Sequence, residues 1–159
     1  MANTFILSRY VVKTLAIAWL ASFALVPTAR ADDKADAVKK ELEKLQGDWQ
    51  LLSAERDGKK IPEDQFKDEQ VTLKGDVMTV TKGGKLMQTS KMILDPTTSP
   101  MSFVREVTDG VGKGMKFHGI YELDGDTLTG CHTVIDKERP KEFSSKNGAR
   151  LFVHKRVKP

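Results

Sequence analysis

The segment Leu45-Gln46-Gly47-Asp48-Trp49 most constrains the fold, because a charged helical pattern ends there and a strand pattern begins. Gly47 is a stop signal for the helix, and Trp49 follows two residues later, at the start of the first predicted strand. An indole ring covers a large apolar area from a single position, so Trp49 can close the floor of a small barrel. We therefore assign structural roles to Gly47 and Trp49.

Residues 1–31 have the composition of an export signal. Two basic residues precede an apolar run from Leu15 to Val26, and Ala29-Arg30-Ala31 supplies the small residues of a cleavage site. This pattern predicts a signal peptide and a protein exported to the periplasm or the cell exterior. The apolar run is shorter than the about 20 residues of a membrane-spanning helix. An uncleaved anchor is the alternative.

The net charge of the whole chain, +4, comes mostly from this segment. Cleavage would remove Arg9, Lys13 and Arg30 and no acidic residue, which lowers the net charge to +1. Basic and acidic residues are interspersed in the remaining 128 residues, so nucleic-acid binding is not expected. A chain of that length fits one domain.

Cys131 is the only cysteine, so it forms no disulfide within the chain. Free cysteines are among the most buried residue types, and a buried thiol is the favoured interpretation. A disulfide between two chains is the alternative. We expect a monomer or a weak homodimer.

Residues 32–46 predict a short amphipathic helix, and residues 47–159 predict a β-barrel domain. Four apolar residues recur at helical spacing in the first segment: Ala35, Val38, Leu42 and Leu45. The charged side chains between them, including Glu41, are assigned to a solvated face.

The rest of the chain is a series of short strand patterns separated by turn residues. After the strand that begins near Trp49, they cover residues 71–74, 77–82, 86–94, 101–107, 115–123, 126–133 and 149–157. About eight such strands are typical of a sandwich or a barrel. No long helical pattern interrupts them, so we predict an all-β fold with an antiparallel sheet.

Five segments carry a resemblance that spans nearly all of residues 32–159. They are LQGDW at 45–49, SAERDGK at 53–59, GIYELDGDTL at 119–128, RPKEFSS at 139–145 and KRV at 155–157. Through them the sequence resembles the planctomycete-type family of small exported lipocalin-like proteins, whose function is unknown. The resemblance implies an up-and-down β-barrel, which in lipocalins encloses one small apolar ligand.

The resemblance also implies that a basic residue on the last strand packs across the first-strand tryptophan. Arg156 matches that position for Trp49, and a cation over an aromatic face is a stabilising contact. Gly130 and His132 depart from the apolar residues expected of the family at their positions.

Residues 115–133 predict a hairpin around the turn Asp124-Gly125. Counting outward from that turn places Gly119 opposite Gly130 and Phe117 opposite His132. The more apolar face should point inward, and it contains Met115, Phe117, Gly119, Tyr121, Leu123, Leu128, Gly130 and His132. The two glycines either open a pocket or admit a bulky neighbour such as Trp49 or Phe103. The close packing of protein interiors favours the neighbour.

Met101, Phe103 and Arg105 share one face of another predicted strand. If that face points inward, the Arg105 guanidinium enters the barrel and is a natural anchor for a carboxylate or another anionic head group. The alternative, which we favour, places the guanidinium at the rim in water. The candidate ligand-binding residues are Phe103, Arg105, Phe117, Tyr121 and His132.

The same hairpin register places His118 opposite Cys131 on the outer face. A zinc site needs about four ligands, and no third ligand is visible in the sequence, so no metal is predicted. No orienting acid or oxyanion donor can be assigned to a cysteine–histidine nucleophile. No catalytic residue and no cofactor are predicted.

The sequence therefore favours an exported, single-domain lipocalin-like barrel that binds a small apolar or amphiphilic ligand and catalyses nothing. The alternative is a barrel with a filled interior that serves as a structural or protein-interaction module of the cell envelope. The two hypotheses differ in whether the inner face encloses a cavity or is packed solid.

Overall fold

The computed structural model describes residues 31–158. The predicted signal peptide, residues 1–31, lies outside this range except for its last residue. In chain order the elements are α1 (Ala31–Leu45), β1 (Gly47–Arg56), β2 (Lys59–Lys60), η1 (Glu63–Gln65), β3 (Glu69–Lys74), β4 (Val77–Lys82), β5 (Lys85–Asp95), β6 (Met101–Gly110), β7 (Lys116–Asp124), β8 (Thr127–Val134) and β9 (Arg150–Arg156). η1 is a single turn of 3₁₀ helix.

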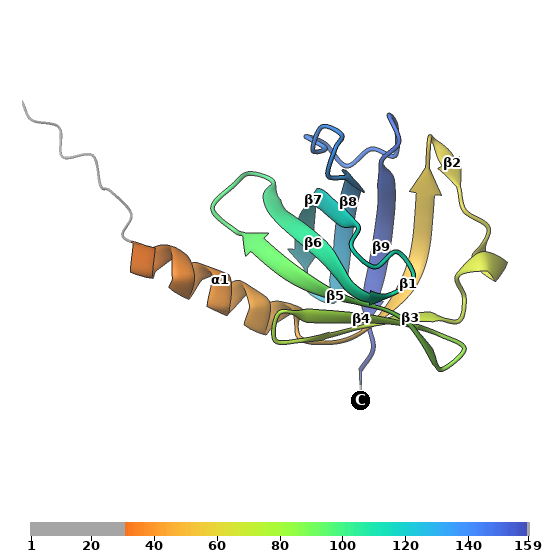
Figure 1. Ribbon diagram of the computed structural model, residues 1–159, viewed down its shortest axis with the longest axis horizontal. Coiled ribbons are helices and arrows are strands. Elements are labelled where there is room, and N and C mark those ends of the chain that lie inside the picture. Colours follow the sequence, from red (N-terminus) through yellow and green to blue (C-terminus); the bar gives the residue numbers. More distant parts are fainter. Residues whose placement is uncertain (1–30, 159) are drawn as a thin grey trace, which may run out of the picture.

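Eight strands form a closed antiparallel barrel, which confirms the predicted all-β fold (Figure 1). β1 pairs with β3, each strand from β3 to β8 pairs with the next along the chain, and β9 pairs with β1 to close the barrel. The two-residue strand β2 folds back on the end of β1 after the turn Asp57-Gly58. A closed barrel leaves no long edge strand unpaired.

The hairpin of β7 and β8 has a different register from the predicted one. Its two-residue turn is Gly125-Asp126, with Asp124 opposite Thr127, and Gly119 lies opposite His132. Gly125 has a positive φ of 55°, and a glycine at the first central position is typical of a type II′ turn. The predicted pairing of Gly119 with Gly130 is therefore wrong.

The inner face of this hairpin is nevertheless the predicted one, because moving the turn by one residue shifts the partners by two positions and preserves the alternation. Met115 is the exception. It lies before β7 and is exposed, so its predicted inward orientation is wrong.

Two aromatic rings fill the space beside the hairpin glycines, as the packing hypothesis predicted. A Cβ atom at Gly119 would overlap the Phe103 ring, and one at Gly130 would overlap the Phe152 ring. Phe103 was among the expected neighbours, whereas Phe152 was not. The glycines thus admit bulky side chains into the middle of the barrel.

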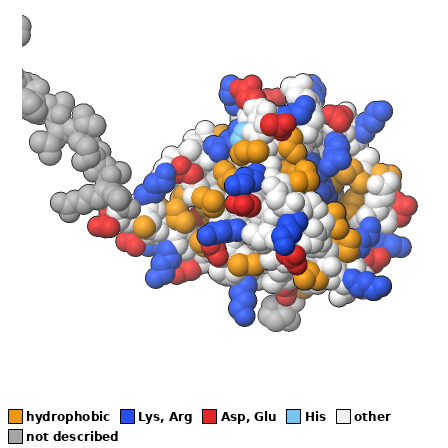
Figure 2. Space-filling view, in the orientation of Figure 1, with side chains coloured by type: hydrophobic (Ala, Val, Ile, Leu, Met, Phe, Trp, Pro, Cys, Tyr) orange, Lys and Arg blue, Asp and Glu red, His pale blue; other side chains and the backbone are white. Residues whose placement is uncertain are grey.

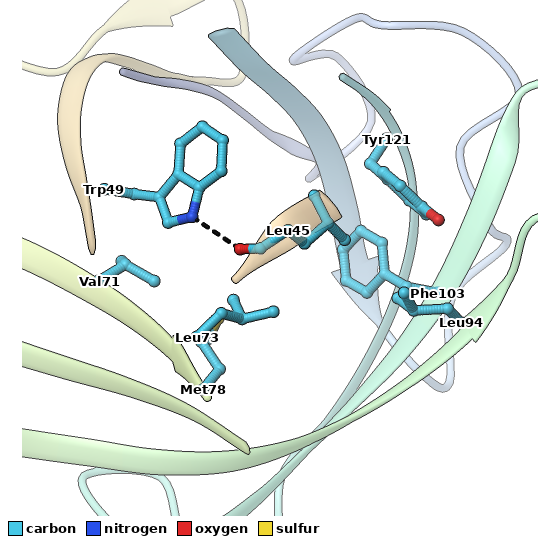
Figure 3. Packing of buried hydrophobic residues seen from close by; sticks show 8 residues of the cluster. All are labelled: Leu45, Trp49, Val71, Leu73, Met78, Leu94, Phe103 and Tyr121. Atoms are coloured by element: carbon cyan, nitrogen blue, oxygen red, sulfur yellow. Dashed lines mark hydrogen bonds between the residues drawn. The ribbon is translucent and has the colours of Figure 1, made fainter. Parts of the chain in front are cut away.

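The floor of the barrel is built from Trp49, the end of α1 and Arg156. Trp49 has no exposed surface, and its Nε1 donates a hydrogen bond of 3.0 Å to the Leu45 carbonyl (Figure 3). The Arg156 Cζ lies 4.2 Å from the centre of the Trp49 ring, so the contact implied by the family resemblance is present. The guanidinium also donates to the carbonyls of Lys44 and Gln46. These carbonyls are acceptors that a helix end leaves without an intrahelical partner.

Helix α1 extends from this end of the barrel, next to the connection between β5 and β6 (Figure 1). Leu45 is buried in the core, and Val38 and Leu42 pack against the same cluster. Glu41 is only 4% exposed, and its carboxylate lies 2.8 Å from the Lys44 Nζ. Its predicted place on a solvated face is therefore wrong, because the helix turns this side chain toward the barrel.

Replacing Arg156 with lysine should lower the free energy of unfolding by about 1–3 kcal/mol, since an ammonium cannot stack on Trp49 and donate to two carbonyls together. Urea denaturation followed by circular dichroism measures the change. Lys155→Arg, at an exposed neighbouring position, should change stability by less than about 0.5 kcal/mol. Equal stabilities of Arg156→Lys and the unaltered protein would contradict this role for Arg156.

Candidate functional site

A cavity of about 60 Å³ lies inside the barrel, above the floor. Its apolar lining comes from Leu45, Trp49, Val71, Leu73, Met78, Met92, Leu94, Phe103, Leu128 and Phe152, and its polar lining from Arg105, Tyr121, His132 and His154. Several of these side chains form the buried cluster shown in Figure 3. A water molecule occupies about 30 Å³ in the liquid, and pockets for drug-sized ligands measure roughly 300–1,000 Å³. The cavity thus has room for a very small molecule.

Several polar atoms around this cavity are buried without a hydrogen-bond partner in the described part of the chain. They are the Arg105 Nε, the Tyr121 hydroxyl and both ring nitrogens of His154. Nearly all buried polar groups in folded proteins are hydrogen-bonded, because burial without a partner is unfavourable. An interior with several such atoms is unusual and marks this region as the candidate site.

Arg105 lies on the inner face of β6 and lines the cavity, while its side chain as a whole keeps part of its surface in solvent. It pairs with Phe117 of β7, and its Cζ lies 4.5 Å from the centre of the Phe117 ring. The side chain is partly buried, and the Nε atom is fully enclosed. Burial and the nearby Arg150 guanidinium lower the pKa of Arg105 to about 10, against the opposing effect of Glu69. The guanidinium therefore keeps its charge at neutral pH.

Two imidazole rings alternate with phenylalanine rings along the inner wall. The centre of the His132 ring lies 5.1 Å from that of Phe117 and 5.5 Å from that of Phe152, which is 5.2 Å from that of His154. Burial, and then the charges of Arg105 and Arg150, lower the pKa of both histidines, that of His154 to about 3. Both rings are uncharged at neutral pH.

The balance of charge inside the barrel is positive. The Arg150 guanidinium lies 3.8 Å from the Glu69 carboxylate. Among residues 31–158, no carboxylate lies within salt-bridge distance of Arg105. Burial also lowers the pKa of Arg150, with Glu69 acting in the opposite direction. The Glu69 carboxylate thus pairs with Arg150, and no carboxylate of the described residues pairs with Arg105.

Four of the five candidate ligand-binding residues line the cavity: Phe103, Arg105, Tyr121 and His132. Phe117 does not line it, but its ring contacts both Arg105 and His132. Sequence analysis missed Phe152, His154 and Arg150. The sequence could have predicted them, because the inward position of Arg156 implies that every second residue of the last strand also points inward.

His118 and Cys131 do not meet on the outer wall. Cys131 pairs with Ile120, and His118 pairs with Thr133. The Cys131 thiol has no exposed surface and donates to the Ser144 carbonyl at 3.1 Å, and burial raises its pKa. The buried-thiol interpretation is confirmed, and the predicted facing of the two residues is wrong. The His118 Nε2 instead lies 2.6 Å from the Lys137 carbonyl oxygen.

A larger, open cleft of about 640 Å³ lies on the outer wall, where the connection from β8 to β9 folds over the barrel. Its charged residues have both signs, and Lys141 pairs with Glu138 at 2.6 Å. Basic and acidic side chains are likewise interspersed on the face shown in Figure 2. Four of the lining residues are basic and two are acidic, so the outer cleft also carries an excess of positive charge.

Comparison of the sequence with known family models gave no match, and comparison with curated proteins gave none. Among residues 31–158, no helix has the length and apolar character needed to cross a membrane. No group of three or more His, Cys, Asp and Glu side chains in that range is placed to hold a metal ion.

Lowering the pH from 7 to 5 should reduce the free energy of unfolding by roughly 2 kcal/mol for each of His132 and His154. Both rings stay uncharged in the folded protein, whereas in the unfolded chain each takes up a proton below its ordinary pKa of 6.5. Acid therefore favours the unfolded chain from about pH 6.5 downward, and for His154 the loss continues to about pH 3. Urea denaturation at the two pH values measures the effect.

His132→Phe and His154→Phe should each remove about half of this pH dependence. Phe152→Leu is the matched control, because Phe152 lies between the two imidazoles and carries no titratable group. It should lower stability equally at both pH values. A pH dependence that persists unchanged in both histidine variants would show that these rings are not its source.

Proposed function

We propose that this protein is an exported barrel that binds one small amphiphilic molecule in its interior. The observation that carries the proposal is the composition of the internal cavity. Apolar side chains around Trp49 and Phe103 line most of its surface, and buried polar atoms of Arg105, Tyr121 and His154 lack a partner among residues 31–158. A ligand with one polar end and one apolar end matches both parts of this lining.

The volume of the cavity limits the size of the ligand. A space of about 60 Å³ is several times smaller than the roughly 300 Å³ at the lower end of drug-sized pockets. The Phe103 and Phe152 rings occupy the middle of the barrel where the two glycines leave room. We therefore propose a ligand much smaller than a lipid, or one whose polar end alone enters the barrel.

The proposed location is the periplasm or the cell exterior, and the composition of residues 1–31 supports it. The resemblance to small exported lipocalin-like proteins supports both export and ligand binding. The proposal includes no catalysis. Cys131, the one cysteine, points away from the cavity and donates to a backbone carbonyl, which supports a structural role for its thiol.

A filled barrel that serves as an interaction module of the cell envelope is the second candidate function. The small volume of the cavity favours it, since ordered water would satisfy some buried polar atoms without any ligand. The two functions make different predictions about what the protein carries when it is isolated from its host.

Native mass spectrometry of the protein, isolated gently from its own host, should show a reproducible adduct that denaturation releases. Arg105→Met and Tyr121→Phe should lose the adduct, because each removes a polar group of the cavity lining. Lys113→Met, which removes an exposed cation that does not line the cavity, should keep it. A bare mass for the unaltered protein would favour the interaction module.

A further inference from the structure

We propose that the ligand of the interior site is a carboxylate whose head group pairs with Arg105. This inference rests on the proposed function and names the chemical class of the ligand. A carboxylate accepts several hydrogen bonds. It also carries the negative charge that would pair with the positively charged Arg105 guanidinium inside the barrel.

The charge of the interior selects for an anion. Arg105 has no acidic side chain within 4 Å among the described residues, and the Glu69 carboxylate pairs with Arg150 instead. A buried guanidinium is stabilised by a paired carboxylate and by hydrogen bonds to its nitrogen atoms. A cationic ligand would meet the Arg105 guanidinium, and a neutral ligand would leave the charge of Arg105 without a partner.

The other polar groups of the cavity are hydrogen-bond donors suited to the same head group. The Tyr121 hydroxyl keeps its proton, since burial and the charges of Glu41 and Asp95 raise the pKa of the phenol. An uncharged imidazole such as that of His154 carries one N–H donor. The enclosed Arg105 Nε–H is a third donor without a partner in the described chain. Donors outnumber acceptors at this site, as the recognition of a carboxylate requires.

The apolar side chains of the cavity would contact the tail of the ligand. Phe103, Leu94 and Tyr121 belong to the buried cluster that lines the cavity, and the Phe103 and Tyr121 ring centres lie 6.2 Å apart. Closely packed rings leave little room for a chain, so the enclosed tail is short. The same head-group chemistry occurs in short-chain carboxylates and in fatty acids, and chain length separates these two sources.

The test is calorimetric titration of the full-length protein at pH 7 with acetate, butyrate and octanoate, compared with butyramide and butan-1-ol. Butyrate should bind, and the two neutral analogues of equal chain length should bind at least tenfold more weakly, because each lacks the charge that pairs with Arg105. Arg105→Met should weaken butyrate binding roughly tenfold to a hundredfold. Lys113→Met should leave it unchanged.

Binding that is strongest for acetate or butyrate identifies a short-chain carboxylate, and binding that strengthens through octanoate identifies the head group of a longer fatty acid. A chemical-shift change of ¹³C-carboxyl-labelled butyrate on the unaltered protein gives a result that does not depend on the folding of any variant. Equal binding of butyrate, butyramide and butan-1-ol would overturn the carboxylate assignment and leave the proposed function intact. Absence of binding by all five compounds, together with a bare mass of the isolated protein, would overturn both.

Discussion

The contact between Arg156 and Trp49 joins the last strand of the barrel to the first and fixes the helix that precedes it. One guanidinium lies 4.2 Å from the indole centre and donates to two carbonyls at the end of α1, and the indole nitrogen donates to a third. The three carbonyls belong to Lys44, Leu45 and Gln46, where a helix end leaves acceptors unpaired. The helix end, the floor and the closure between β1 and β9 therefore depend on the same two side chains.

The closed floor determines where the polar residues of the inner wall can lie. Trp49 and Leu45 fill the barrel at one end, so the next inward positions along β6 to β9 surround the cavity. The Phe103 and Phe152 rings lie over two glycines of the β7–β8 hairpin, and they narrow the cavity further. Arg105 and the two buried histidines thus face a small volume, in which charge is weakly screened. The interior combines a tightly packed apolar floor with a wall in which Arg105 has no acidic partner among the described residues.

The alternation of residues predicted the strands and the inner face, but partners across a hairpin depend on which two residues form the turn. Asp124-Gly125 and Gly125-Asp126 are both plausible turns in sequence, and the second places glycine where a type II′ turn requires it. Only the choice between them separates His118 from Cys131. Whether Arg105 enters the barrel or lies at its rim was left open, because the sequence does not show whether a long cationic side chain reaches water. Glu41 was misplaced because the sequence does not show which side chains of α1 the helix turns toward the barrel.

The buried arginine is not explained by the stability of the barrel. Replacing a buried charge with an apolar side chain of similar size is often neutral or stabilising, because the desolvation of the charge is unfavourable. Arg105 stacks on Phe117, yet its Nε has no hydrogen-bond partner in the described chain, and two uncharged histidines nearby add further unfavourable burial. An apolar side chain at this position would lie opposite Met92 and on the same face of β6 as Phe103. Burial of the Arg105 charge destabilises the barrel, and a negatively charged group that enters the barrel would offset this loss of stability. The proposed binding of an anionic ligand thus accounts for the least favourable feature of the fold.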